Sequence, residues 1–84
     1  MDTDAKLKHI LEFLDQLSED TSIPRNIRRS ATNAKELLLK IKDPLDVRAA
    51  SAVFMLEDIA NDPNLPLHGR TLIWNLISSL ETLK

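Results

Sequence analysis

The sequence predicts an all-α protein, an antiparallel four-helix bundle built from two αα-hairpins. Residues 14–41 and 56–83 are two versions of one unit, offset by 42 positions, and a period of this size is typical of stacked helix pairs. The chain of 84 residues has one glycine and no tyrosine, which leaves little of the chemistry that strands and tight turns use. We therefore expect a single domain over residues 1–84, with repeat units at about 5–42 and 47–84. The identical pairs of the repeat are Leu14/Leu56, Asp20/Asp62, Pro24/Pro66, Arg28/Arg70, Asn33/Asn75 and Leu38/Leu80.

Two amphipathic stretches predict the first hairpin. Residues 4–18 carry apolar side chains at the three- and four-residue steps of one helix face, namely Leu7, Ile10, Leu11, Leu14 and Leu17. The second helix is expected to hold Pro24 in its opening turn, where the missing N–H does no harm, and to use Ser22 as its cap. We expect it to end near Lys42. Its apolar face is marked by Ile27, Ala31, Ala34, Leu38 and Ile41.

The second hairpin begins with Asp43-Pro44, a capping side chain followed by proline, which is typical of a helix start. This helix is expected to run to about Ala60. Ten of residues 47–60 are apolar, and a helix that is apolar on most sides is buried on more than one of them. The last helix is predicted from Pro66 to the end of the chain, with a stripe of Leu72, Ile73, Leu76, Leu80 and Leu83. The connections are about four to six residues long, so neighbouring helices should be antiparallel.

The predicted core is small. At 84 residues a single core is marginal unless helix packing is efficient or subunits associate. We assign to it Leu7, Ile10, Leu14, Leu17, Ile27, Ala31, Leu38, Ala49, Val53, Leu56, Ile59, Leu72, Ile73, Leu76 and Leu80.

Composition limits the classes of function. The chain has no cysteine, which excludes disulfides, thiolate metal sites and cysteine nucleophiles and fits a reducing compartment. The sequence shows no basic region followed by an apolar stretch, the pattern that marks a signal peptide. No apolar run reaches the roughly 20 residues of a membrane span. The net charge of −2 argues against a protein that coats nucleic acid with its whole surface. We expect a cytoplasmic protein that does not bind membranes.

The turns and the residues after them resemble those of a known family. Residues 20–24 and 62–66 both have the form D-x-x-[IL]-P. They are accompanied by Arg25-Asn26-Ile27-Arg28-Arg29, Val47-Arg48-Ala49-Ala50 and Arg70-Thr71…Trp74-Asn75. With these segments the whole chain resembles a small archaeal family of uncharacterised proteins. The resemblance implies a four-helix bundle in an archaeal cytoplasm, with no assigned catalytic residue. A fainter similarity of residues 43–50 to HEAT repeats hints only that helix pairs are the building unit.

Basic side chains are concentrated in the second helix of an otherwise acidic protein. They are Arg25, Arg28, Arg29, Lys35, Lys40 and Lys42. Such a basic face could bind the phosphate backbone of a nucleic acid or an acidic partner. The alternative, which we favour, is a solvated face that forms ion pairs with the acidic first and third helices across the bundle. No aromatic residue is interleaved with these bases, so stacking on single-stranded nucleic acid is not supported.

Apolar residues away from the core stripes suggest a contact surface in the second hairpin. They are Val47, Ala50, Phe54, Leu67 and Trp74. Trp74 and Leu67 are one heptad apart, and the equivalent residues of the first repeat, Thr32 and Arg25, are polar. Aromatic anchors dominate protein interfaces. The alternative is that the bundle twists enough to bury these side chains.

The remaining polar residues favour structural roles. Arg28 and Arg70 occupy equivalent positions and should hold the loops before their helices, because a guanidinium can bond two acceptors at once. His9 and His68 have no metal-binding spacing, Gly69 should permit close packing, and no catalytic motif is present. We therefore predict no enzyme, no metal and no cofactor. The leading hypothesis is a non-enzymatic protein–protein interaction or self-assembly module, with itself or another protein as the expected partner. The alternative is a nucleic-acid-associated accessory protein that uses the basic face.

Overall fold

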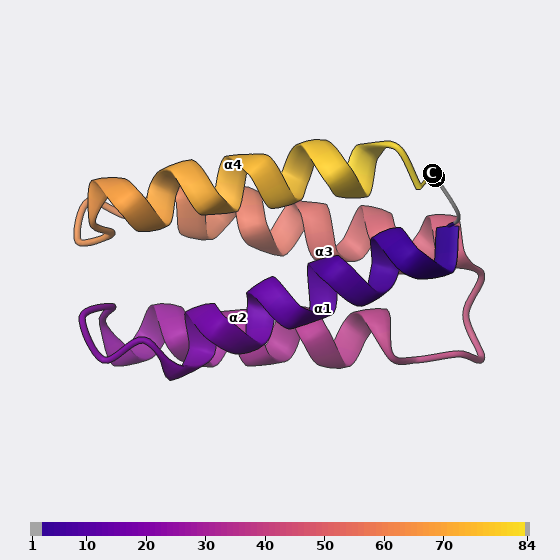
Figure 1. The fold of residues 1–84 in the computed structure, drawn as a ribbon, viewed down its shortest axis with the longest axis horizontal. Helices are drawn as coiled ribbons and strands as arrows, with labels where there is room; N and C mark the ends of the chain where they lie inside the picture. Colours follow the sequence, from indigo (N-terminus) through magenta and orange to yellow (C-terminus); the bar gives the residue numbers. More distant parts are fainter. Residues whose placement is uncertain (1–2, 84) are drawn as a thin grey trace.

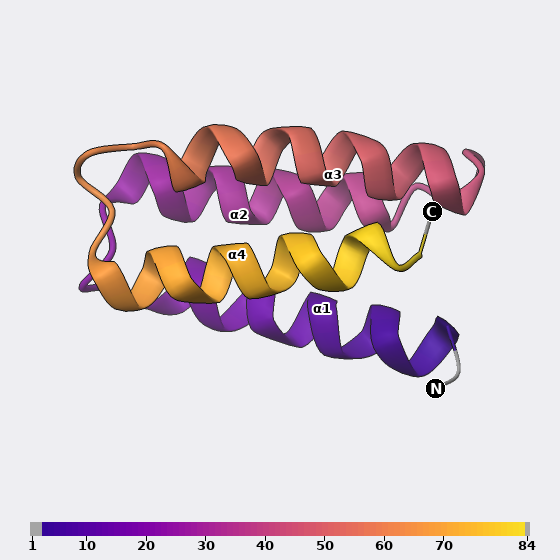
Figure 2. The same ribbon diagram turned by 90° about the horizontal axis from the view of Figure 1, so that it is seen from above.

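A computed structural model describes residues 3–83 of the chain, which form α1 (Thr3–Glu19), α2 (Arg25–Leu38), α3 (Leu45–Ala60) and α4 (Leu67–Glu81). No strand occurs within residues 3–83. Figure 1 shows α1 with α2 as one antiparallel hairpin and α3 with α4 as the other. Each helix packs against two others, in the order α1–α2–α3–α4 and back to α1, so the helices occupy four corners around the core (Figures 1 and 2). The predicted all-α bundle is confirmed.

Proline sets the beginning of three of the helices. Pro24, Pro44 and Pro66 are the residues just before α2, α3 and α4, with φ of −54°, −57° and −60°, values that the ring itself enforces. Each proline carbonyl accepts the backbone N–H four residues on, at 3.1, 3.0 and 3.0 Å. The prediction that Ser22 and Asp43 cap α2 and α3 was wrong, because proline occupies the cap position and disfavours helical backbone in the residue before it.

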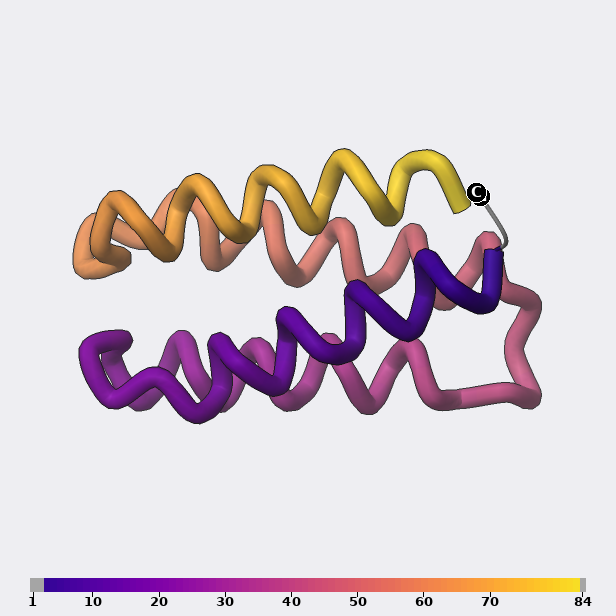
Figure 3. The backbone as a smooth tube through the Cα atoms, viewed as in Figure 1, coloured from indigo at the N-terminus to yellow at the C-terminus, as the bar shows by residue number. Residues whose placement is uncertain are grey.

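The second helix ends four residues earlier than predicted. Leu38 is its last residue, and residues 39–44 form the connection to α3 (Figure 3). Within this connection the Ile41 N–H donates to the Leu39 carbonyl at 2.9 Å. The prediction that Ile41 lies on the buried face was therefore wrong, and its side chain is 84% exposed. The chain must reverse before Pro44, so the residues that would have continued α2 are needed for the turn.

The core lies between all four helices and follows the predicted stripes. All predicted core residues are buried except Leu7 and Leu72, which are half-buried and pack against the others. Two buried residues in the hairpin turns were missing from the predicted core. Ile23 is 1% exposed and Leu65 is 4% exposed, and they occupy equivalent positions of the repeat. The D-x-x-[IL]-P turns therefore insert an apolar residue into one end of the core.

Gly69 lies where these two turn residues meet. A Cβ atom at this position would be 2.9 Å from Leu65 Cδ1 and 3.1 Å from Ile23 Cδ1, closer than ordinary van der Waals contact. The predicted packing role of Gly69 is thus supported by geometry. The absent side chain lets the residues from both turns approach the first turn of α4.

Within the described part of the chain, no helix is both long enough and apolar enough to cross a membrane.

Candidate functional site

The apolar residues predicted as a contact surface are exposed on the second hairpin. We call Val47, Ala50, Phe54, Leu67 and Trp74 the α3/α4 patch. The exposed fraction is 80% for Phe54, 77% for Leu67, 49% for Val47 and 46% for Trp74, and Ala50 is also exposed. The bundle therefore does not twist enough to bury these side chains.

Helix geometry explains why the α3/α4 patch shares one face. On α3, Val47, Ala50 and Phe54 follow the i, i+3, i+7 spacing of one side, while Val53 and Leu56 on the other side are buried. The two helices are antiparallel and joined after Ala60, so Phe54 and Trp74 lie about 9 and 10 Å from the connected ends. They are therefore at nearly the same level.

The orientation of α4 places Trp74 on the outer side of the hairpin. Leu72, Asn75 and Ser79 lie on the side of α4 that faces α1. Trp74 is five residues before Ser79, which corresponds to about 140° around the helix. Its indole therefore lies on the flank turned away from α1. Leu67 is one heptad earlier and follows the same line.

The first hairpin provides an internal comparison for the α3/α4 patch. The positions 42 residues before Ala50, Phe54, Leu67 and Trp74 hold Lys8, Glu12, Arg25 and Thr32, and these side chains are exposed too. The same fold thus accommodates charged or polar residues at the corresponding places. The apolar character of the patch is therefore not a requirement of the helix pair itself.

The predicted basic face is divided by the fold. Lys35 forms an ion pair with Asp15 of α1, and Arg28 Nε donates to the Ile23 carbonyl at 3.0 Å. Arg25 and Arg29 are exposed near the beginning of α2, whereas Lys40 and Lys42 are exposed in the connection beyond its other end. The 14 residues of α2 extend about 20 Å. The bases therefore form two separate pairs rather than one continuous stripe.

Arginine secures all three connections between helices. Arg28 contacts the Ile23 carbonyl, and Arg70 Nη2 donates to the Asp62 carbonyl at 3.3 Å, as predicted for this equivalent pair. Sequence reasoning missed Arg48, which donates to the carbonyls of Asp43 and Leu38. The missed signal is the spacing P-x-x-x-R, which the sequence repeats at Pro24, Pro44 and Pro66.

The two hairpin turns contact each other reciprocally. In the first turn Asp20 Oδ1 accepts the backbone N–H of Ser22 at 2.9 Å, and in the second turn Asp62 Oδ1 accepts that of Asn64 at 2.8 Å. The other oxygen of each carboxylate approaches the opposite hairpin. Asp20 Oδ2 lies 3.4 Å from His68 Nε2, and Asp62 Oδ2 accepts from Asn26 Nδ2 at 3.3 Å.

Asp20, Ser22 and His68 have the residue types of a hydrolase triad but not its arrangement. His68 Nε2 approaches both Asp20 Oδ2 at 3.4 Å and the Ser22 hydroxyl oxygen at 3.5 Å. A triad needs one ring nitrogen for the acid and the other for the nucleophile. The Ser22 hydroxyl and then its backbone N–H hold the pKa of Asp20 below its usual value, because their hydrogen bonds stabilise the carboxylate. The cluster therefore supports turn structure.

The histidines are separated by the fold. His68 belongs to the turn cluster, whereas His9 lines a groove between α1 and α4. Among the residues that the structure describes, no group of three or more histidine, cysteine, aspartate or glutamate side chains could hold a metal ion.

Comparison with known proteins gives relatives along the whole chain. The model of a family described as "Uncharacterised protein family (UPF0147)" matches residues 1–83. A UPF0147 protein of Methanosarcina acetivorans is 54% identical over 77 residues, which cover 92% of this chain and 79% of that protein. A UPF0147 protein of Saccharolobus islandicus is 49% identical over 83 residues, which cover 99% and 93%.

Solved structures agree with this assignment. A crystal structure of a protein described as of unknown function is 48% identical, with a TM-score of 0.94 over 99% of this chain and 94% of that one. A crystal structure of a UPF0147 protein from Thermoplasma acidophilum is 40% identical, with a TM-score of 0.93 over 96% and 95%. The resemblance to an archaeal family of uncharacterised proteins is thus confirmed, and the chain belongs to the UPF0147 family.

Proposed function

We propose that the chain is a non-enzymatic interaction module of the cytoplasm that associates with a second copy of itself through the α3/α4 patch. The observation that carries the proposal is the exposure of Phe54, Leu67 and Trp74 on one face of one hairpin. Tryptophan and phenylalanine are enriched at the centres of interfaces, and homodimer interfaces are more apolar than the rest of a protein surface. Ala50, on the same side of α3 as Phe54, would let a facing helix approach closely.

Two further observations support self-association. A core built from 84 residues is small, and association of subunits is a common way for such chains to bury more apolar surface. The corresponding face of the first hairpin carries Lys8, Glu12 and Arg25, charges that keep a surface in solvent. The chain therefore has one apolar hairpin face and one charged one, which favours contact between the two apolar faces.

The proposal is tested by measuring solution mass with light scattering over a hundredfold concentration range. The informative variant combines Phe54→Glu, Leu67→Arg and Trp74→Thr, because these are the residues that the first repeat carries at the same positions. We expect the native chain to be dimeric and the variant monomeric, with unchanged helix content by circular dichroism. A native chain that stays monomeric throughout would contradict the proposal.

A matched control removes exposed apolar side chains elsewhere. Leu39 and Ile41 are 51% and 84% exposed in the connection between α2 and α3, outside the α3/α4 patch. The variant with both changed to serine should remain dimeric. If it dissociates as the patch variant does, general surface hydrophobicity and not the patch drives association.

A second candidate function is binding to nucleic acid through the basic face. Arg25 and Arg29 favour it, because both are exposed, lie one helical turn apart and have no ion pair within residues 3–83. Two arginines would neutralise about two phosphates. A plot of the logarithm of the binding constant against the logarithm of the salt concentration should therefore have a slope of about −2.

Fluorescence anisotropy with labelled duplex DNA and RNA at low salt tests this candidate. The variant Arg25→Glu/Arg29→Glu should abolish binding, whereas Lys40→Glu/Lys42→Glu should weaken it less, because that pair lies at the far end of α2. Absence of binding by the native chain at low salt would remove this candidate and leave the first proposal unaffected.

A further inference from the structure

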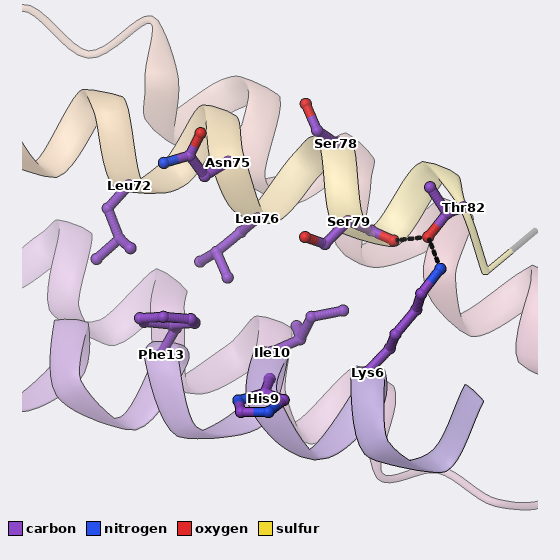
Figure 4. Close-up of a pocket in the computed structure, with 10 residues that line it drawn as sticks. All are labelled: Lys6, His9, Ile10, Phe13, Leu72, Asn75, Leu76, Ser78, Ser79 and Thr82. Carbon is purple, nitrogen blue, oxygen red and sulfur yellow. Dashed lines mark hydrogen bonds between the residues drawn. The ribbon is translucent and has the colours of Figure 1, made fainter. Parts of the chain in front are cut away.

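The α1–α4 seam holds a groove. It has a volume of about 600 Å³ and is lined from both helices (Figure 4). No turn joins these two helices directly, so only tertiary packing holds them side by side. Theirs is the most sparsely packed of the four contacts between neighbouring helices. The two helices cross at an angle, since they approach each other towards the beginning of α1 in Figure 1 and separate there in Figure 2. Phe13, on the wall of the groove, stays 40% exposed.

The two ends of the groove differ in chemistry. Phe13 and Leu72 face each other at one end, and Lys6 and Thr82 lie at the other (Figure 4). Lys6 Nζ donates to Thr82 Oγ1 at 3.2 Å across the opening, and the Thr82 hydroxyl donates in turn to the Ser79 carbonyl at 2.6 Å. The ammonium has three N–H donors, so this bond leaves two for another acceptor.

The lining is also unusual in its charge. Thirteen of the 84 residues of the chain are aspartate or glutamate and its net charge is −2. Among residues 3–83, however, none of the side chains that line the groove is acidic. Its cation is Lys6, accompanied by the imidazole of His9 and by the Asn75 amide. A cation in an opening free of carboxylates complements an anion, while an apolar far end complements hydrocarbon.

We propose that this groove binds an anionic amphiphile, a small molecule with one carboxylate or phosphate head and an apolar tail. Lys6 would bind the head beside Thr82, and Phe13 and Leu72 would contact the tail. Pockets of this volume between bundle helices, apolar with a few placed polar groups, are typical of ligand sites. At about 30 Å³ for each water-sized group, the groove has room for roughly twenty heavy atoms, enough for a head and about ten carbons.

Calorimetric titration with amphiphiles of one chain length tests the head group. The probes are decanoate, decyl phosphate and decyltrimethylammonium, each below its micelle concentration, and decanol below its solubility limit. We expect saturable binding of at least one of the two anions, at least tenfold tighter than the cation. Comparison of decanoate with decyl phosphate then tells which head is preferred. Equal affinity for the cation, or no binding of any probe at millimolar concentration, would overturn the proposal; the latter result would leave the groove to a helix of another protein.

Variants locate the site. Lys6→Met keeps the aliphatic stem and removes the charge, so it should weaken anion binding at least fivefold. Lys8→Met is the matched control, since Lys8 is an exposed lysine of α1 that does not line the groove, and it should bind as the native chain does. Phe13→Ser should weaken all four probes together. Equal effects of the two lysine variants would contradict the assignment.

Amide chemical shifts provide an independent readout. Titration of ¹⁵N-labelled protein with the anion that binds should shift residues of α1 and α4 along the groove, such as His9, Asn75 and Ser79. The patch variant Phe54→Glu/Leu67→Arg/Trp74→Thr should give the same shifts, because the α3/α4 patch lies on another side of α4. Shifts confined to the patch would show that the amphiphile binds there instead and would overturn the proposal.

Discussion

Arg48 Nη1 donates to the backbone carbonyl of Leu38 at 2.7 Å. Leu38 is the last residue of α2 and Arg48 lies in the first turn of α3, so one side chain joins the end of one helix to the beginning of the next. The last carbonyls of a helix have no partner within it and carry partial negative charge. The same guanidinium donates from Nε to the Asp43 carbonyl at 3.0 Å. Arg48 thus holds both ends of the connection that joins the two hairpins.

Replacing Arg48 by methionine should lower the free energy of unfolding by about 1–2 kcal/mol. Hydrogen bonds from a charged donor contribute roughly 1.5–3 kcal/mol, and partial exposure of this side chain to solvent reduces that value. Urea denaturation measures the loss. The control is Arg29→Met, an exposed arginine, which should change stability by less than about 0.5 kcal/mol. Similar losses in both variants would mean that Arg48 stabilises the protein only through its charge.

Gly69→Ala should destabilise the protein by about 1 kcal/mol although alanine is the better helix former. The new methyl group would lie 2.9 Å from Leu65 Cδ1 and 3.1 Å from Ile23 Cδ1, and overpacking of this kind costs about 1–3 kcal/mol. The gain in helix propensity is only about 1 kcal/mol. Thermal denaturation measures the balance.

The double variant Gly69→Ala/Leu65→Val separates these two effects. Leu65→Val alone should cost stability, because it removes a buried methylene group. In the double variant the shorter side chain makes room for the methyl group. Its loss of stability should therefore be smaller than the sum of the losses in the two single variants. If the two losses of stability are strictly additive, contact with Leu65 is not what excludes a larger side chain at Gly69.

Asp20 should make the stability of the protein depend on acid pH. Its pKa is lowered by the hydrogen bonds from the Ser22 hydroxyl and backbone N–H. A carboxyl group whose pKa is lower in the folded than in the unfolded state stabilises the fold at pH values above the unfolded pKa, which is near 3.8. This stabilisation disappears as the pH falls through the folded pKa. The difference in stability between the native chain and Asp20→Asn should therefore narrow as the solution is acidified below pH 3.8.

Carbon-detected NMR of the carboxyl group checks the cause. Ser22→Ala removes the hydroxyl donor and keeps the backbone N–H, so it should move the pKa of Asp20 upwards towards 3.8. Asn64→Ala is the control, and the pKa of Asp20 should not change in it. Asn64 bonds to Asp62 through its backbone N–H, and that substitution leaves the N–H in place. An unchanged titration of Asp20 in Ser22→Ala would contradict the role of the hydroxyl.

Trp74→Ala should weaken self-association more than it weakens folding. A tryptophan at the centre of an interface contributes about 2 kcal/mol or more to binding, a factor of about thirty in dissociation constant. Its contribution to folding should be smaller, because Trp74 stays 46% exposed in the single chain. Sedimentation and urea denaturation measure the two quantities. Trp74 is the sole tryptophan of the chain, so its emission should also shift to shorter wavelength as concentration rises. A variant that keeps its mass but melts much lower would place Trp74 in the core instead.

Local patterns were enough to predict the helices and most of the core. Leu14, Leu56 and Leu80 each belong to an apolar stripe with helical spacing in their own helix, and their burial follows from that pattern. The end of α2 could not be predicted in this way, because Ile41 continues the apolar period beyond Leu38. What stops the helix is a tertiary requirement: the chain must turn back onto the core and begin α3 at Pro44.

The turn cluster shows a second limit of sequence reasoning. Asp20 and Asp62 were visible as equivalent residues, but their long-range partners were not. Each carboxylate reaches across to the other hairpin, to His68 and Asn26, and no local spacing reveals a contact between distant turns. The exposed residues were easier, because Phe54 and Trp74 depart from the core stripe. The groove between α1 and α4 was not predicted, since it depends on the angle between two helices that are far apart in sequence.

The reciprocal turn contact also bears on the origin of the fold. Asn26 and His68 are separated by 42 positions, as are Asp20 and Asp62, so the two contacts are one contact made twice about an approximate twofold axis. A reciprocal contact of this kind is the geometry by which two identical subunits pair in a symmetric dimer. Residues 39–44 then act as a tether that raises the local concentration of one half around the other to the millimolar range of short linkers. A duplicated gene could thereafter let each half acquire its own surface, charged on one hairpin and apolar on the other.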